Sequence, residues 1–226
     1  MIFFIVALAA VAANGPASKT VLPSKLPRQA ASEGDQTILR SAATVRVADW
    51  IAASHDNGAL PYMIIDKVAA SLVLFDAKGN SLGQAPVLIG VASGDHATPG
   101  VGSKNLAEIG PAEKTTPAGR FLAKYGLAAG GEKILWVDYA TSVAIHPIPP
   151  KARKAEQRRE RMLSPNPDDN RITFGCINLT KAFYSKRVQP LFQKKGGYVY
   201  VLPDTEPLEA IFPRLRIQAL DRATKF

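Results

Sequence analysis

The chain has 226 residues, of which 46% are hydrophobic and 21% are charged, a composition typical of one folded domain with extensions. Its single cysteine excludes an internal disulfide, and no Cys/His cluster suggests a structural metal. The net charge of +9 suits an anionic partner, but no basic stripe with interleaved aromatic residues indicates nucleic acid.

The first 36 residues indicate export. Residues 1–13 are apolar but shorter than the ~20 residues of a membrane-spanning helix, and small residues at 11–13 resemble a cleavage site. We therefore expect a signal peptide here, with an uncleaved membrane tether as the alternative. Residues 14–36 are rich in Pro, Ser, Ala and Lys and are expected to form a flexible linker. The predicted location is the periplasm or cell envelope.

Residues 37–60 show a loose helical spacing of apolar residues and are predicted to form a helical lead-in that ends near Asn57-Gly58. His55 and Asp56 stand at that end. We expect them to be solvated rather than to bind a metal.

Short strand-like runs dominate residues 61–203, which predicts a mainly β domain with α elements (α+β). Residues 93–111 are rich in glycine and include Asp95 and His96, a weak metal signal; this loop is expected to shape a cleft. No metal or cofactor is expected. The predicted strands cover residues 62–66, 71–76, 84–91, 121–125, 134–139, 143–146 and 198–202.

A basic insertion occupies residues 147–170. It opens with Pro147-Ile148-Pro149-Pro150, continues through a helix-favouring run at 151–161 with six basic and two acidic residues, and ends in a polar loop. Such a run is usually a solvated face, but this one separates two candidate catalytic residues, so we expect it to lie over the site as a lid. Arg153 and Arg158 are the candidate substrate contacts. Residues 204–226 are predicted to form a basic, partly helical tail.

Those two candidates are Cys176 and His146. A thiolate is the reactive form of cysteine, and an imidazole at a strand end could supply the base that generates it. Gly175 allows close approach of a substrate, and backbone N–H groups there could face an oxyanion. Asn178 and Thr180 are residue types of a helix N-terminus, which predicts that Cys176 lies just before a helix. The alternative is an inert buried cysteine and a structural histidine.

Residues 173–178, Thr-Phe-Gly-Cys-Ile-Asn, resemble the signature of the L,D-transpeptidase catalytic domain, which has Ser or Thr, usually His, then Gly-Cys, an aliphatic residue, and Asn or Arg. The Ile-His pair at 145–146 and the Thr-Pro-Ala-Gly-Arg-Phe segment at 116–121 are similar to that family as well. The resemblance covers about residues 61–203. Two departures are Phe174 in place of the usual His and a longer gap, thirty residues, between base and nucleophile.

The resemblance implies a β-sandwich or barrel with a helix following the catalytic Cys, and it implies a peptidoglycan reaction. Cys176 would attack a stem tetrapeptide, release D-Ala and pass the acyl group to a second stem, with His146 as acid and base. Thr173, Gly175 and Asn178 would order the loop or hold the oxyanion, and Phe174 would contact substrate. An L,D-carboxypeptidase that uses water and a non-catalytic wall-binding domain remain open, as does the oligomeric state. The implied partners are stem peptides and the anionic wall surface.

Overall fold

The computed structural model describes residues 39–216, except residues 129 and 153. The predicted signal peptide or tether, the linker, Arg153 and the last ten residues of the predicted tail lie outside the described residues. Within the described ranges, no helix has the length and apolar character needed to cross a membrane.

Helix α1 (Ala42–Ser54) is anchored to the first strand through its N-terminus. The Ser41 hydroxyl accepts the Thr44 N–H at 3.0 Å, which satisfies one of the N–H groups that a helix start leaves unpaired. Ser41 and Thr44 also donate their hydroxyls to Asp66 Oδ2, at 2.5 and 3.1 Å. Since Asp66 ends strand β1, the cap fixes the helix against the sheet.

Eight strands form one mixed sheet in the order β3-β2-β1-β10-β5-β6-β7-β9, and two more strands form a separate pair. The β1–β10 and β7–β9 pairs are parallel, and the other neighbours in the large sheet are antiparallel. The strands are β1 (Tyr62–Asp66), β2 (Ser71–Phe75), β3 (Ser81–Pro86), β4 (Ile89–Gly90), β5 (Gly119–Leu127), β6 (Lys133–Asp138), β7 (Val143–Pro147), β8 (Arg171–Thr173), β9 (Ile177–Leu179) and β10 (Gly197–Val201).

The large sheet curls so that its two edges meet. Leu88, just past β3, forms an antiparallel bridge with Asn178 of β9, and the two residues exchange N–H···O bonds of 3.1 and 2.9 Å. Beside this seam, β4 pairs with β8. The predicted fold class, mainly β with α elements, is confirmed, and every predicted strand corresponds to an observed one. The run predicted at 84–91 is divided between β3 and β4 by Val87 and Leu88.

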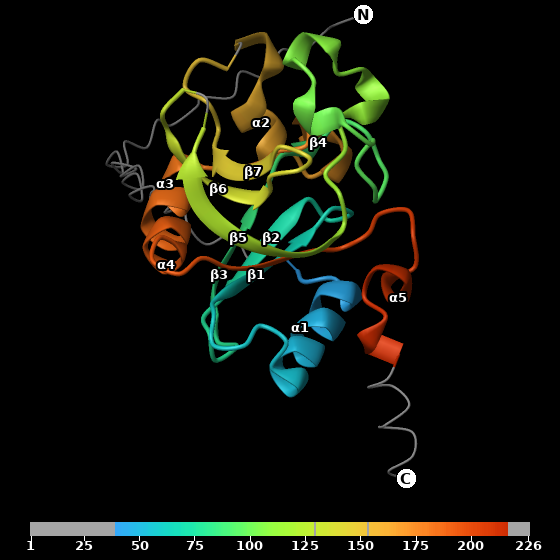
Figure 1. The fold of residues 1–226 in the computed structure, drawn as a ribbon, viewed down its shortest axis with the longest axis vertical. Helices are drawn as coiled ribbons and strands as arrows, with labels where there is room; N and C mark the ends of the chain where they lie inside the picture. Colours follow the sequence, from blue (N-terminus) through green and yellow to red (C-terminus); the bar gives the residue numbers. More distant parts are fainter. Residues whose placement is uncertain (1–38, 129, 153, 217–226) are drawn as a thin grey trace, which may run out of the picture. The chain divides into compact units, whose positions relative to one another are not determined.

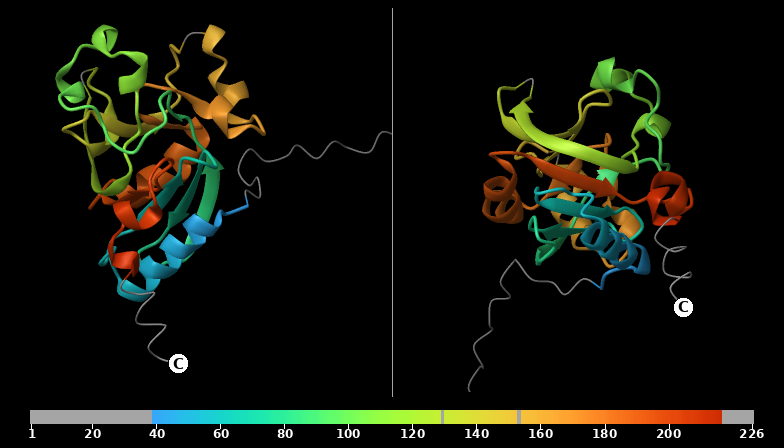
Figure 2. Two further views of the ribbon diagram at one scale, coloured as in Figure 1. Left: turned by 90° about the vertical axis from the view of Figure 1, so that its right-hand side faces the viewer. Right: turned by 60° about the horizontal axis from the view of Figure 1, so that its bottom comes forward.

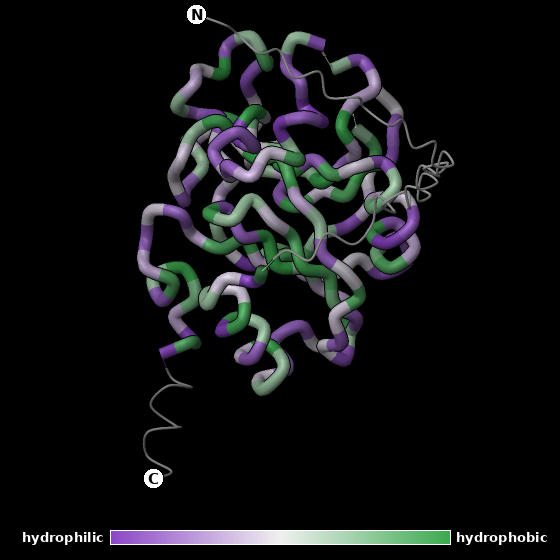
Figure 3. The backbone as a smooth tube through the Cα atoms, turned by 180° about the vertical axis from the view of Figure 1, so that it is seen from behind, coloured by the Kyte–Doolittle hydropathy of each residue, from purple (hydrophilic) through white to green (hydrophobic). Residues whose placement is uncertain are grey.

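Two apolar clusters fill the two faces of the strands. Met63, Ile65 and Leu72 point into the inside of the curled sheet together with Ile145 and Ile177. On the outer face, alternate residues pack against α1 and the C-terminal segment, as Tyr62, Ile64 and Tyr200 do against Trp50 and Phe212. Figure 3 shows the hydrophobic strands in the interior and hydrophilic segments in the surrounding loops. This alternation is the period of two expected of strands covered on both faces.

The helix predicted after Cys176 is present but differs in two ways. Strand β9 stands between the cysteine and the helix, because Ile177 and Leu179 enter the inner core. The helix itself is broken into α3 (Lys181–Phe183), a π-helical stretch (Tyr184–Val188) and α4 (Gln189–Phe192). Pro190 has no N–H to give to the carbonyl four residues earlier, which accounts for the irregular turn.

The run at 151–161, with its strong helix propensity, forms only short pieces. In the described part of the run they are η4 (Lys154–Glu156) and α2 (Arg158–Met162). A further short piece, η5 (Pro167–Asn170), follows in the polar loop after the run. Gln157 has a φ of 45° and separates the first two pieces. This left-handed residue ends the helical path that propensity alone favours.

The two long loops lie at the same end of the fold. Residues 91–118 carry η1 (Val101–Ser103), η2 (Leu106–Glu108) and η3 (Pro111–Glu113). Figures 1 and 2 show this loop, in green, and the segment containing α2, in orange, at the end away from α1 and α5 (Leu208–Ile211). The loops are therefore placed to frame one site.

Candidate active site

Cys176 follows a tight turn between β8 and β9 that only glycine fits. Gly175 has a φ of +120°, and a Cβ there would lie 2.7 Å from the carbonyl oxygen of Thr115. That distance is shorter than van der Waals contact, so the absence of a side chain lets residue 115 lie directly against the turn. The loop at 91–118 is thereby packed against the nucleophile candidate.

Two threonine hydroxyls hold this turn. Thr173 Oγ1 donates to the carbonyl of Cys176 at 2.6 Å and accepts the Gly175 N–H at 3.2 Å. Thr116 Oγ1 donates to the carbonyl of Gly175 at 2.8 Å. The Gly175 N–H, which the sequence suggested as an oxyanion donor, is therefore already engaged by Thr173. The Cys176 N–H is the backbone donor of this turn that we consider for an oxyanion.

His146 and Asn178 are brought side by side by the parallel pairing of β7 and β9. They are register partners, as are Ile145 and Ile177. Because Ile145 and Ile177 face the inner core, His146 and Asn178 face the opposite side. Cys176 precedes Asn178 by two residues, so it starts from the same side of β9. Three predicted site residues thus share one face of two adjacent strands.

The ring of His146 is oriented by the next peptide carbonyl. Its Nδ1 lies 2.8 Å from the Pro147 carbonyl oxygen, an acceptor, so Nδ1 carries the proton and Nε2 keeps its lone pair. Asn178 Nδ2 is 3.5 Å from Nδ1 and 3.3 Å from Nε2. Nearly equal distances mean that the amide packs against the ring instead of pointing along one lone pair. The sequence alone left the residue that orients His146 open.

The basic segment delivers one arginine to this face. Arg158, at the start of α2, donates from Nη1 to Asn178 Oδ1 at 2.7 Å and from Nε to Glu156 Oε2 at 2.6 Å. Its side chain is 13% exposed, so this cation is largely withdrawn from solvent. Arg158 therefore contacts the site through Asn178, whereas the other predicted arginine contact, Arg153, lies outside the described residues.

Burial keeps both candidate catalytic groups neutral. Burial raises the pKa of the Cys176 thiol, against the opposing effects of the nearby Ala144 backbone and of the Arg158 charge. Burial likewise lowers the pKa of His146, which the Pro147 hydrogen bond raises and the Arg158 charge lowers further. The resting pair is thus a thiol and an imidazole, not a thiolate and an imidazolium.

The thiol makes its own contact with the β6–β7 hairpin. Cys176 Sγ lies 3.7 Å from the carbonyl oxygen of Ser142, a residue with a φ of 57°. Among the described residues, no hydrogen bond joins this thiol to His146. The thiol thus bonds a backbone carbonyl instead of its candidate base in this arrangement, and catalytic hydrogen bonds are commonly absent or long in resting enzymes.

Phe174 is displayed beside the nucleophile. Its side chain is 41% exposed, and Lys114 Nζ lies 3.9 Å above the centre of its ring, a cation–π contact. Phe174 stands where the family suggested by residues 173–178 usually has His. This chain thus has an aromatic ring with the Lys114 cation over it at that position.

Three contacts at this site were not predicted from the sequence, and they are made by Thr116 and by the carbonyl groups of Ser142 and Pro147. Thr116 lay within the segment at 115–121 that carried part of the resemblance, so its position was signalled but not its bond to Gly175. The two carbonyl groups belong to the backbone. No residue type marks such an acceptor in a sequence.

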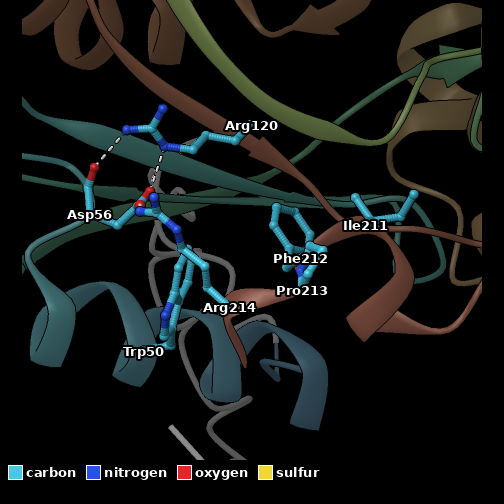
Figure 4. A pocket seen from close by; sticks show the side chains of 7 residues that line it. All are labelled: Trp50, Asp56, Arg120, Ile211, Phe212, Pro213 and Arg214. Atoms are coloured by element: carbon cyan, nitrogen blue, oxygen red, sulfur yellow. Dashed lines mark hydrogen bonds and ion pairs between the residues drawn. The ribbon is translucent and has the colours of Figure 1, made fainter. Parts of the chain in front are cut away.

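A hollow of about 500 Å³ lies elsewhere, between α1 and the C-terminal segment (Figure 4). Asp56, expected to be solvated, is buried there, with hydrogen bonds from Arg120 Nε (2.5 Å), Tyr200 OH (2.7 Å) and Arg214 Nη1 (3.3 Å). These three donors bring the carboxylate inside the fold. The lining residues are Trp50, Asp56, Arg120, Ile211, Phe212, Pro213 and Arg214. With no cysteine or histidine in that lining, the hollow is not the candidate active site.

No protein-family model matches this chain, and no curated protein matches it. Solved structures that it is similar to include L,D-transpeptidases. One is the catalytic domain from E. faecium, with 14% identity and a TM-score of 0.37, covering 64% of this chain and 98% of that one. A second, from Stackebrandtia nassauensis, has 15% identity and a TM-score of 0.36, with 73% and 68% covered.

A third solved structure, from Mycobacterium smegmatis, has 17% identity and a TM-score of 0.37; the comparison covers 64% of this chain and 59% of that protein. These structures carry the same family name that residues 173–178 suggested. At such identities and TM-scores the likeness carries no argument about the reaction.

Proposed function

We propose that this protein is a cysteine acyltransferase of the cell wall, an L,D-transpeptidase that acts on peptidoglycan stem tetrapeptides. The observation that carries the proposal is the common face of β7 and β9, which holds Cys176, His146 and Asn178 with His146 Nε2 available as a base. The resemblance of residues 173–178 supplies the substrate class.

The reaction uses groups already described. The Cys176 thiol gives its proton to His146 Nε2 while the sulfur forms a bond to the carbonyl carbon of the third stem residue. The tetrahedral oxyanion is held by the Cys176 N–H. When the bond to D-Ala breaks, His146 returns the proton to the leaving amine, and a thioester remains. The amine of a second stem then attacks the thioester, forms the cross-link and restores the thiol.

The neutral resting pair suits this sequence of steps. A thiol whose pKa is raised by burial is protected from unselective reaction, and the imidazole whose pKa is lowered is unprotonated at neutral pH and ready to accept a proton. Arg158 favours the thiolate, since its charge lowers the pKa of Cys176. In this sequence of steps, Cys176 Sγ exchanges the Ser142 carbonyl for His146 Nε2 as activation begins.

A covalent adduct tests the nucleophile. A β-lactam of the carbapenem class should add its mass to the wild-type protein, and intact-protein mass spectrometry should show one adduct. Cys176→Ala should remain folded and form none, and Cys176→Ser should be nearly inert because a hydroxyl lacks the accessible anion. An adduct on Cys176→Ala, or no adduct on the wild type, would contradict the assignment of Cys176 as the nucleophile. The alternative of a non-catalytic wall-binding domain would then be favoured.

Analysis of the reaction products identifies the acceptor of the acyl group, an amine or water. Purified tetrapeptide muropeptides should yield free D-Ala and cross-linked dimers with the wild-type protein. Tripeptides without dimers would instead make the protein an L,D-carboxypeptidase that uses water.

As part of the same proposal, the chain acts in the periplasm or cell envelope, against an anionic wall that its +9 net charge attracts.

A further inference from the structure

A buried ionic cluster lies behind the site and is not used in the chemistry above. Lys67, 1% exposed, donates from Nζ to Asp95 Oδ1 at 2.7 Å and to the carbonyl oxygens of Gly94 at 2.6 Å and Thr116 at 3.0 Å. The same ammonium is 3.3 Å from Asp204 Oδ1. We call Lys67, Asp95, Arg171 and Asp204 the buried cluster.

Every charge in the buried cluster is paired. Arg171 Nη2 donates to Asp204 Oδ2 at 2.6 Å, so two cations face two carboxylates. Asp95 Oδ2 also accepts the Thr205 hydroxyl at 2.6 Å and backbone N–H groups. Although burial raises the pKa of Asp95, the Lys67 ammonium and the Thr205 hydroxyl hold it well below its usual range. Asp95 is therefore ionised near neutral pH, and its hydrogen bonds with Lys67 and with the backbone of residues 204–206 make the buried cluster a charged hub.

Thr116 links the buried cluster to the nucleophile turn. Its carbonyl accepts from Lys67, and its hydroxyl donates to the Gly175 carbonyl at 2.8 Å while accepting the Gly90 N–H at 2.9 Å. At 2% exposure, Thr116 has no water to replace these partners. Its position is thus defined on both sides, by Lys67 and by the β4 backbone.

Peptide geometry carries this constraint to Cys176. The Gly175–Cys176 peptide is planar and trans, since no cis peptide bond occurs in the part of the chain that the structure describes. In such a unit the carbonyl and the N–H point in opposite directions. Because Thr116 holds the Gly175 carbonyl, the Cys176 N–H must point away from Thr116.

We propose that Thr116 and Lys67 are positioning residues that aim the Cys176 N–H at the oxyanion formed when the sulfur attacks a carbonyl. The inference rests on the proposed acyl transfer. It gives the buried cluster a role, because an oxyanion donor is effective only when its direction is fixed before the charge appears. It also explains why the Gly175 carbonyl is tied to a side chain anchored to a charged hub.

Thr116→Val is the informative variant, and Thr44→Val is its matched control. Both remove one buried hydroxyl with little change of shape; Thr44, 1% exposed, donates to Asp66 at 3.1 Å, within the α1 cap. The measurements are the rate of acylation of Cys176 by a carbapenem and the rate of its alkylation by iodoacetamide. Acylation forms an oxyanion, whereas alkylation does not.

Thr116→Val should slow acylation at saturating carbapenem about 10- to 100-fold, somewhat less than outright loss of an oxyanion donor. The carbapenem concentration that gives half of the maximal acylation rate should stay within about twofold of the wild-type value. The rate of alkylation should also stay within about twofold of wild type at each pH. Thr44→Val should change neither rate by more than about twofold. Equal losses in both reactions, or no loss of acylation in Thr116→Val, would overturn the inference.

Lys67→Met should act in the same direction, but it leaves Asp95 without its cation and can unfold the domain, so Thr116→Val decides. Hydrogen exchange of peptides covering residues 173–178 separates this inference from the proposed function. Faster exchange there in Thr116→Val, and not in Thr44→Val, supports positioning even if the wild type forms no adduct. Unchanged exchange refutes positioning, whatever the reaction.

Discussion

Cys176 and His146 lie where burial opposes ionisation of both, yet one arginine acts on both pKa values. The Arg158 charge lowers the pKa of the thiol, which favours the reactive anion, and lowers the pKa of the imidazole, which favours the free base. The first effect assists proton transfer from sulfur to nitrogen, whereas the second keeps the imidazole unprotonated at rest but makes it a weaker base. Arg158 is therefore more than a possible substrate contact at this site.

Replacing Arg158 with Met should move the pH profile of Cys176 alkylation to higher pH, because the thiolate loses a neighbouring cation. The rate at pH 8 should fall roughly 1.4- to fivefold, as expected for a charge interaction of ~0.2–1 kcal/mol. Arg161→Met is the matched control, since Arg161 lies on the same helix but bonds the Asp169 carbonyl at 3.0 Å. A profile identical to wild type in Arg158→Met would show that its charge does not act on the sulfur.

His146→Ala should slow carbapenem acylation about 10²- to 10⁴-fold at neutral pH, the usual contribution of a general base. The rate should recover in part as pH rises, because hydroxide then ionises the thiol. Stopped-flow acylation between pH 6 and 10 measures this. Wild-type rates at neutral pH would mean that His146 only fills space beside Asn178.

At the scale of elements, the β8–β9 turn is shaped by a contact that no local pattern shows. Gly175 is required by its φ of +120° and by the Thr115 carbonyl, which belongs to a loop sixty residues earlier. Strands β8 and β9, three residues each, are held by partners on either side of this turn. The β8–β9 turn therefore depends on the loop that carries Thr115 and on the strands that pair with β8 and β9.

Gly175→Ala should destabilise the fold by about 1–3 kcal/mol, the cost of a strained backbone residue, and should also abolish carbapenem adducts because the turn must move. Gly58→Ala is the control: its φ is +57° and no atom lies within 4 Å of a built Cβ. That control should cost about 1–2 kcal/mol and leave acylation intact. Urea unfolding and adduct mass test both variants. Normal acylation by a folded Gly175→Ala would show that the turn tolerates the shift.

For the whole molecule, stability at low pH is expected to fall in two windows. The lowered pKa of His146 means that the unfolded chain binds a proton first, so stability declines as pH falls below about 6.5. The lowered pKa of Asp95 contributes stability that is present above about pH 4 and is lost as pH falls further. Asp95 should thus contribute to the loss of stability in the lower window and His146 to the loss in the upper one.

Asp95→Asn should lower the urea midpoint at pH 7 and flatten its dependence on pH below 4, because one carboxylate no longer has to be protonated on unfolding. His146→Gln should flatten only the window near pH 6. Urea titrations at pH 7, 5.5, 4 and 3 separate the two. An Asp95→Asn variant with the wild-type slope below pH 4 would place the acid sensitivity elsewhere.

The strands and the two reactive residues were within reach of the sequence. Runs such as residues 62–66 and 71–75 are rich in apolar residues, including β-branched ones, and this composition predicts strands. A lone cysteine after glycine, together with a histidine at a strand end, indicates a candidate nucleophile and base. These features are local, because the burial of a strand and the chemistry of a residue both depend on a few neighbouring positions in the sequence.

Tertiary structure alone decided the rest. Strand β9 is too short for a pattern, and its pairing with β7 is what brings Asn178 beside His146. Propensity predicted a longer helix at 151–161, but the chain turns at Gln157 and sends Arg158 to Asn178. Lys67, Thr116 and Gly175 meet across gaps of 49 and 59 residues. Such contacts depend on which surfaces the folded chain buries together, and no local period encodes that choice.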